Sequence, residues 1–149
     1  MKIVRVLSIS TVLLSLVLLS SCSKPNEKLY YGTFTSEKGS AQKTVHTPGA
    51  FKDYAQLSDS TPVQEGTEKI VKEWMDSEGN TYFQTDATIT VGPYKNTVPK
   101  AQTLTRINKA GTVMEFMWNG VVEFNPSSFP TKIDPTDALR YRMYNRVAE

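Results

Sequence analysis

The chain has 149 residues, of which 39% are hydrophobic and 21% charged. This composition is typical of one globular domain and excludes a disordered, collagen-like or disulfide-built protein. Two of the 17 basic residues lie in the first five positions, and the other 15 balance the 15 acidic residues, so the charge gives no argument for nucleic acid as a partner.

The N-terminal segment is typical of a secretory signal. Lys2 and Arg5 precede the uncharged apolar stretch 6–19, which is shorter than the roughly 20 residues that a permanent membrane span needs. The following Leu19-Ser20-Ser21-Cys22 resembles the lipobox of bacterial lipoproteins, and this resemblance covers residues 1–23. It implies cleavage after Ser21, a diacylglyceryl group on the sulfur of Cys22, and a further acyl chain, such as palmitate, on the new amine.

Lipidation of Cys22 implies a protein fixed to the cell envelope, because two or three acyl chains anchor a protein stably where one chain does not. Ser23 stands where an Asp tends to retain lipoproteins at the inner membrane, so the resemblance favours the outer membrane in an organism with two membranes. We therefore divide the chain into a cleaved signal peptide (1–21), a lipidated cysteine with a polar tether (22–28) and one β-domain (29–149). Cys22 is the only cysteine, so no disulfide is expected.

Beyond the tether, β-branched and aromatic residues occur in short runs separated by turn residues, with no helical period. Within 80–91, Phe83, Ala87, Ile89 and Val91 fall on one face and polar residues on the other, as in a half-buried antiparallel strand. Strands are predicted at 29–34, 67–75, 80–91, 101–108, 112–118, 120–125 and 138–147.

Residues 35–66 are rich in polar and turn-forming types, but a structureless loop of that length is uncommon in a compact domain. We therefore expect a strand near 42–47 and a short helix near 49–57. The helix prediction depends on Pro48 at its first turn and on Phe51, Tyr54 and Ala55 at positions i, i+3 and i+4.

These elements predict an all-β fold, an antiparallel meander of about seven or eight strands that forms a small barrel or a sandwich. The up-and-down order with tight late hairpins is similar in pattern to small bacterial lipocalin-like, or calycin-like, barrels. The interior of a barrel of about eight strands is either filled by side chains or holds one small ligand. For a hollow interior, the candidate ligand-binding residues are Trp74, Phe83, Phe116 and Trp118.

Catalytic motifs are missing from the sequence. His46 is the only histidine, and its polar surroundings favour a surface or loop residue over a catalytic base. No serine lies in a nucleophile elbow and no glycine-rich phosphate cradle follows a strand, so we expect no enzyme, no metal and no cofactor.

Two carboxylates, Glu115 and Glu123, lie within apolar runs. In a barrel interior such a carboxylate would have a raised pKa and would need a partner such as Arg106. We favour the other arrangement, in which Glu115 lies on the outer face and Met114, Phe116 and Trp118 form the core.

Two further features leave alternatives open. Arg140, Arg142 and Arg146 share one face of the last predicted strand, which we interpret as a solvated outer face rather than a grip for anionic lipid or an acidic partner. Phe129 lies in a proline-bracketed loop and is either a contact at a protein interface or a plug on the barrel mouth.

The anchor, the β-domain and the missing catalytic motifs predict a non-enzymatic envelope lipoprotein that binds a protein or an envelope component through its loops. A lipocalin-like carrier of a small apolar ligand is the alternative. A hydrolase, or an inhibitor of one, is the third hypothesis.

Overall fold

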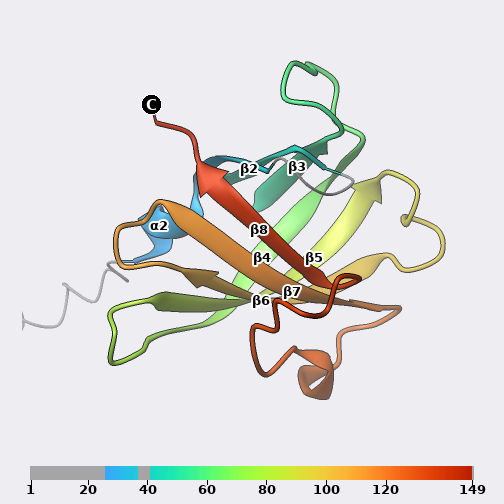
Figure 1. The fold of residues 1–149 in the computed structure, drawn as a ribbon. Coiled ribbons are helices and arrows are strands. Elements are labelled where there is room, and N and C mark those ends of the chain that lie inside the picture. The colour runs from blue at the N-terminus through green and yellow to red at the C-terminus, as the bar shows by residue number, and fades with distance from the viewer. Residues whose placement is uncertain (1–25, 37–40, 149) are drawn as a thin grey trace, which may run out of the picture.

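Eight strands pair with their neighbours in chain order, and the first strand pairs with the last, so the sheet closes into a barrel (Figure 1). The computed structural model describes residues 26–36 and 41–148; the expected signal peptide and Cys22 lie outside the described residues. The predicted all-β antiparallel meander is confirmed, and the barrel rather than the sandwich is the architecture formed.

A short helix precedes the strands, and a 3-10 turn lies in the last long connection. The elements are α2 (Glu27–Tyr30), β1 (Gly32–Thr35), β2 (Lys43–Thr47), β3 (Ala50–Tyr54), β4 (Gln64–Met75), β5 (Thr81–Val91), β6 (Lys100–Ile107), β7 (Val113–Val121), η1 (Pro126–Ser128) and β8 (Tyr141–Arg146).

The strand expected near 42–47 is present as β2, but the helix expected at 49–57 is wrong. Gly49 adopts a φ of 80°, which closes a tight turn after Pro48 and returns the chain antiparallel to β2 as β3. The same residues that mimic a helical face then alternate: Phe51 faces the interior while Lys52 is exposed. Three apolar residues at helical spacing are too short a pattern to specify a helix. The turn brings the segment beside β2, and pairing with β2 favours a strand instead.

Two other boundaries differ from the prediction. The strand expected at 29–34 begins as α2, and β1 starts only at Gly32. The strands expected at 112–118 and 120–125 form the single strand β7, which ends at Val121. Gly120 is therefore a position within a strand and not a turn.

A bulge in β4 reverses the face that its second half presents. The register with β5 shifts between Ile70 and Lys72, so one residue of β4 has no partner opposite it. Before the bulge, even-numbered residues such as Glu68 face the interior. After it, Trp74 pairs with Tyr82 on the outer surface, because an extra residue inverts the alternation of a strand.

The two ends of the barrel differ. The tight hairpin turns and α2 lie together at one end, which we call the closed end (Figure 1). The long connections 55–63, 92–99 and 122–140 lie at the other, the open end. This arrangement follows from the meander, since every second connection of an up-and-down barrel lies at the same end.

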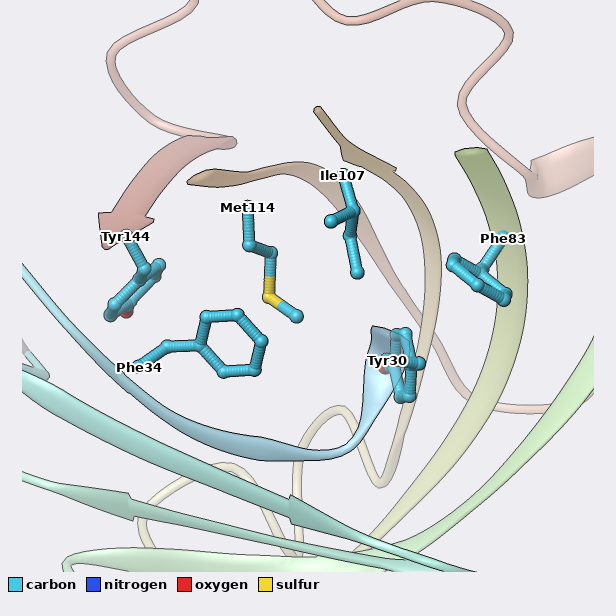
Figure 2. Close-up of a cluster of buried hydrophobic side chains, with 6 residues drawn as sticks. All are labelled: Tyr30, Phe34, Phe83, Ile107, Met114 and Tyr144. Atoms are coloured by element: carbon cyan, nitrogen blue, oxygen red, sulfur yellow. The ribbon is translucent and has the colours of Figure 1, made fainter. Parts of the chain in front are cut away.

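The closed end is sealed by a buried cluster that surrounds Tyr30 of α2 (Figure 2). Arg146 reinforces the seal: its guanidinium donates to the carbonyl oxygens of Leu29, Tyr31 and Gly111 and lies 4.5 Å from the ring centroid of Phe34. One side chain thus ties β8 to the segment that enters the barrel. The cluster consists of Tyr30, Phe34, Phe83, Ile107, Met114 and Tyr144.

The connection 122–140 packs against the outer wall. Asn119 of β7 donates to the carbonyl oxygen of Ser128, and Gln102 of β6 accepts from the backbone N–H of Asn125. Phe129 in this connection is buried, with its ring edge-on to Phe124. Phe129 therefore matches neither alternative: it is buried against its own connection and so is not presented to a partner, and it does not line the cavity as a plug on the barrel mouth would.

Candidate ligand-binding cavity

The barrel encloses a cavity of about 270 Å³. It extends from Tyr30 and Met114 near the closed end to Trp118 and Val98 at the open end. A second buried cluster, made of Phe51, Ala87 and Ile89 with Ala101 packed against it, forms part of the wall of this cavity.

One part of the cavity wall is apolar. It is supplied by the inward-facing positions of β3, β5 and β7, where small and large residues alternate with outward polar ones. Burial of this face drives the barrel to close and leaves a surface suited to hydrocarbon or aromatic groups. The wall contains Phe51, Ala87, Ile89, Met114, Phe116 and Trp118.

A buried polar network lies beside Phe51, on side chains of α2, β2, β3 and β4. Glu68 Oε1 lies 2.8 Å from Nδ1 of His46, and Glu68 Oε2 accepts from the hydroxyl of Tyr30 at 2.8 Å. The side chains of Glu68 and His46 are only 4% and 12% exposed. Such buried ionisable groups are stable only when they are paired, and this pair holds both residues in fixed orientations.

Asp53 continues the network toward the open end. It accepts hydrogen bonds from Thr44 and from Nε2 of Gln64, the latter at 3.2 Å. Burial raises the pKa of Asp53 above its ordinary value of 3.8, and this rise is opposed by the hydrogen bond from Thr44, by the nearby His46 and by the hydrogen bond from Gln64. Burial also raises the pKa of Tyr30 well above its usual range, and the nearby Glu68 raises it further.

Thr44, His46 and Glu68 follow the order hydroxyl, imidazole and carboxylate, which is the order of a nucleophilic triad. The Thr44 hydroxyl lies 3.3 Å from Nε2 of His46. Thr44 is also a hydrogen-bond partner of Asp53, so the three side chains belong to the one polar network that lines the cavity.

The connection 92–99 folds over the mouth of the cavity. Its backbone is held by the bond from the Val98 N–H to the Tyr94 carbonyl oxygen, and the Tyr94 ring lies 6.4 Å from Trp118. Gly120 makes room for this fold, because a Cβ at that position would overlap the side chain of Val98. The mouth is therefore narrowed by a loop whose Val98 side chain lies against Gly120.

Of the four predicted ligand-binding residues, Phe116 and Trp118 line the cavity. Phe83 is fully buried in the cluster at the closed end and does not line it. Trp74 lies outside the barrel, stacked on Tyr82 with ring centroids 5.3 Å apart, because of the bulge in β4.

The network itself was missed, because charged residues were assigned to the surface. The interpretation of His46 as a surface or loop residue is wrong: it lies inside, on the same strand face as Thr44. The predicted strand at 42–47, with inward Thr44 and His46 in alternation, was the available signal.

The face assigned to the last strand was inverted in the same way. Arg142 lines the cavity and Tyr144 is buried, while Met143 is exposed. The interpretation of the arginines as a solvated outer face is therefore wrong for Arg142 and Arg146. Arg140 lies before β8 and pairs with Asp137.

The preferred arrangement of the carboxylates is confirmed for Glu115, which lies on the outer face. It accepts from Nε of Arg106 at 2.8 Å and from the hydroxyl of Tyr141 at 2.8 Å. β7 continues for six residues, about 20 Å, after Glu115, and Glu123 is exposed beyond its end at Val121. These two residues therefore do not form an acid–base pair.

Within residues 26–36 and 41–148, no cluster of three or more histidine, cysteine, aspartate or glutamate side chains is arranged to hold a metal ion. No helix in the described part of the chain has the length and apolar character to cross a membrane.

No protein-family model matches this chain, and neither a curated protein nor a solved structure matches it significantly. The site is therefore argued from its own geometry.

Proposed function

We propose that this protein is a lipid-anchored envelope protein whose barrel binds a small, largely apolar ligand, without catalysing its conversion. The observation that carries the proposal is the cavity of about 270 Å³. It is nearly twice the roughly 150 Å³ that suffices to bind benzene, and its walls combine apolar surface with a few fixed polar groups, as small-molecule sites do.

The lipid anchor is a proposal from the sequence. If Cys22 is lipidated, the length of the tether limits how the barrel can be oriented on the membrane. Four residues separate Cys22 from Glu27, the first residue of α2, and the five Cα-to-Cα steps between the two span at most about 18 Å. The strand β5, with 11 residues, is about 36 Å long. A chain anchored at Cys22 would therefore hold the closed end toward the bilayer and direct the open end away from it.

Native mass spectrometry tests both parts of this proposal. The protein is extracted gently from its own membrane and compared with the same sample after denaturation. We expect an acyl mass on Cys22 that a Cys22→Ala variant lacks, and a bound species of a few hundred daltons that denaturation releases. A folded protein that carries no small species, and takes up none when apolar compounds are added, would contradict the binding function.

A second candidate function is docking of a partner protein at the open end. Its support is the rim, where apolar side chains of three connections are exposed to solvent, Leu139 by 81% and Val122 by 69%. Charged substitutions at Leu139 and Val122 would abolish capture of such a partner without altering the cavity. The exposed apolar residues at this end are Leu57, Val63, Val91, Tyr94, Val122, Phe124 and Leu139.

A further inference from the structure

The charges inside the barrel specify the chemical class of the ligand, given the binding function proposed above. Asp53 and Glu68 are the two carboxylates that line the cavity. Glu68 has a partner at each oxygen, since Nδ1 of His46 lies 2.8 Å from Oε1 and the Tyr30 hydroxyl donates to Oε2 at 2.8 Å. Asp53 receives hydrogen bonds from Thr44 and Gln64, which are neutral, and His46 is the one basic group that acts on it electrostatically.

No lysine or arginine in the described ranges lies within ion-pair distance of Asp53. The two cationic residues that border the cavity are engaged elsewhere. Lys100 Nζ lies 3.2 Å from Asp86, and Nη1 of Arg142 donates to the carbonyl oxygens of Ala138 and Tyr141. Asp53 is thus a partly buried acid that faces the cavity, and the one imidazole near it, that of His46, is already bonded to Glu68.

The position of Asp53 suits the head group of a bound molecule. It lies one residue before the end of β3, so it is near the mouth of the cavity and not at its sealed base. β3 and β7 are four strands apart in a closed barrel of eight and so lie on opposite sides. The aromatic rings of Phe116 and Trp118 therefore face the carboxylate across the cavity, and aromatic faces attract cations.

We propose that Asp53 binds the head group of the ligand and that this head group is a cationic nitrogen, of the ammonium or amidinium class, on an apolar body. A protonated nitrogen supplies the positive charge that the neutral donors Thr44 and Gln64 do not, together with further N–H donors. A buried carboxylate is stable in its ionised form only when such a partner is present. The apolar body then lies against Phe51, Ala87 and Ile89.

Titration of the full-length chain with three ligands of one shape tests this proposal. Hexylammonium, hexanol and hexanoate share their hydrocarbon and differ in the charge of the head. Calorimetry is performed at neutral pH on the unmodified protein, on Asp53→Asn and on Glu123→Gln. The last is the control, since Glu123 is an exposed carboxylate at the same end of the barrel.

We expect hexylammonium to bind most tightly, and Asp53→Asn to weaken it by about 10- to 100-fold, the range for a lost hydrogen bond to a charged group. Hexanol binding should not change in Asp53→Asn, which also shows that the variant is folded. Glu123→Gln should leave all three affinities unchanged.

The other outcomes contradict either the cationic head group alone or the binding function as well. If hexanol binds but hexylammonium gains nothing from Asp53, the cationic head group is wrong and the binding function stands. If hexanoate binds most tightly and Arg142→Gln removes that preference, the ligand is an anion held by Arg142. If none of the three binds, the binding function fails as well.

Discussion

Glu68 on β4 reaches His46 on β2 past the end of the intervening strand, with Oε1 2.8 Å from Nδ1. This contact is possible because β3 begins at Ala50, and the backbone N–H of Glu68 donates to the carbonyl oxygen of Gly49 in the turn before it. Tyr30 of α2 donates to the other oxygen of the same carboxylate. One side chain therefore connects the helix at the closed end with two strands of the wall.

Glu68→Gln should destabilise the fold. The amide keeps the shape but removes the charge from the bonds to His46 and Tyr30, and we expect a loss of about 1.5–3 kcal/mol in the free energy of unfolding. Denaturant unfolding measures this loss. Glu65→Gln is the control, because Glu65 lies 3.8 Å from Lys52 in a partly exposed pair, which is worth at most about 1 kcal/mol. Equal losses in the two variants would contradict the role of Glu68.

Gly66→Ala should destabilise the barrel more than Gly120→Ala. A Cβ on Gly66 would overlap the backbone oxygen of Thr88 and the ring of Phe51, and backbone within a sheet cannot move aside cheaply. We expect a cost of about 1–3 kcal/mol or more for Gly66→Ala. A Cβ on Gly120 would overlap the side chain of Val98 and approach that of Trp118, and side chains adjust more readily than the backbone of a sheet. Thermal unfolding of the two variants checks the order, and a larger loss for Gly120→Ala would contradict it.

The two tryptophans should report differently on the ligand. Trp118 lines the cavity, whereas Trp74 lies outside and is stacked on Tyr82. A bound apolar molecule should therefore change the fluorescence of a Trp74→Phe protein and leave that of a Trp118→Phe protein unaltered. The reverse result would mean that the ligand binds outside the barrel.

Asp53 should make stability depend on pH in the sense opposite to that of a salt-bridged carboxylate. Burial raises its pKa in the folded protein above the ordinary 3.8, so the folded state binds this proton more readily than the unfolded state. The contribution of Asp53 to stability therefore falls as the pH rises through this window. Asp53→Asn should be more stable than the unmodified protein at neutral pH.

The same stability difference should shrink below the unfolded pKa, where Asp53 is protonated in both states. Unfolding curves of the two proteins at pH 7 and pH 3 measure the difference. An Asp53→Asn variant that is less stable at neutral pH would show that the carboxylate gains more from its hydrogen bonds than burial costs it.

Hairpin order and strand composition were sufficient to predict the class of fold. Alternation in 80–91 predicted β5 nearly to the residue, and the turns before it and after β6 indicated the antiparallel pairing. These features are local, since a strand that buries one face must alternate with a period of two. The expected segment at 42–47 also formed, because β-branched residues occupy it.

The tertiary structure alone decided which face of each strand points into the barrel and which points to solvent. Alternation divides a strand into two faces, but it does not say which face is inside when both carry polar groups, as in β2 and β8. His46 and Arg142 were assigned outward on charge alone. In the barrel, His46 has Glu68 and Arg142 has backbone carbonyl oxygens as partners within the fold.

The position of a β-bulge, where one strand has an extra residue, also cannot be predicted from the alternation of apolar and polar residues. The bulge at Val71 moves Trp74 outside, although its spacing from Glu68 and Ile70 would place it inside an unbroken strand. The sequence by itself therefore determined that the chain forms antiparallel strands in order, because that depends on neighbouring residues. The hollow interior and its polar network required closure of the barrel, since it is the pairing of β1 with β8 that brings all eight inner faces together.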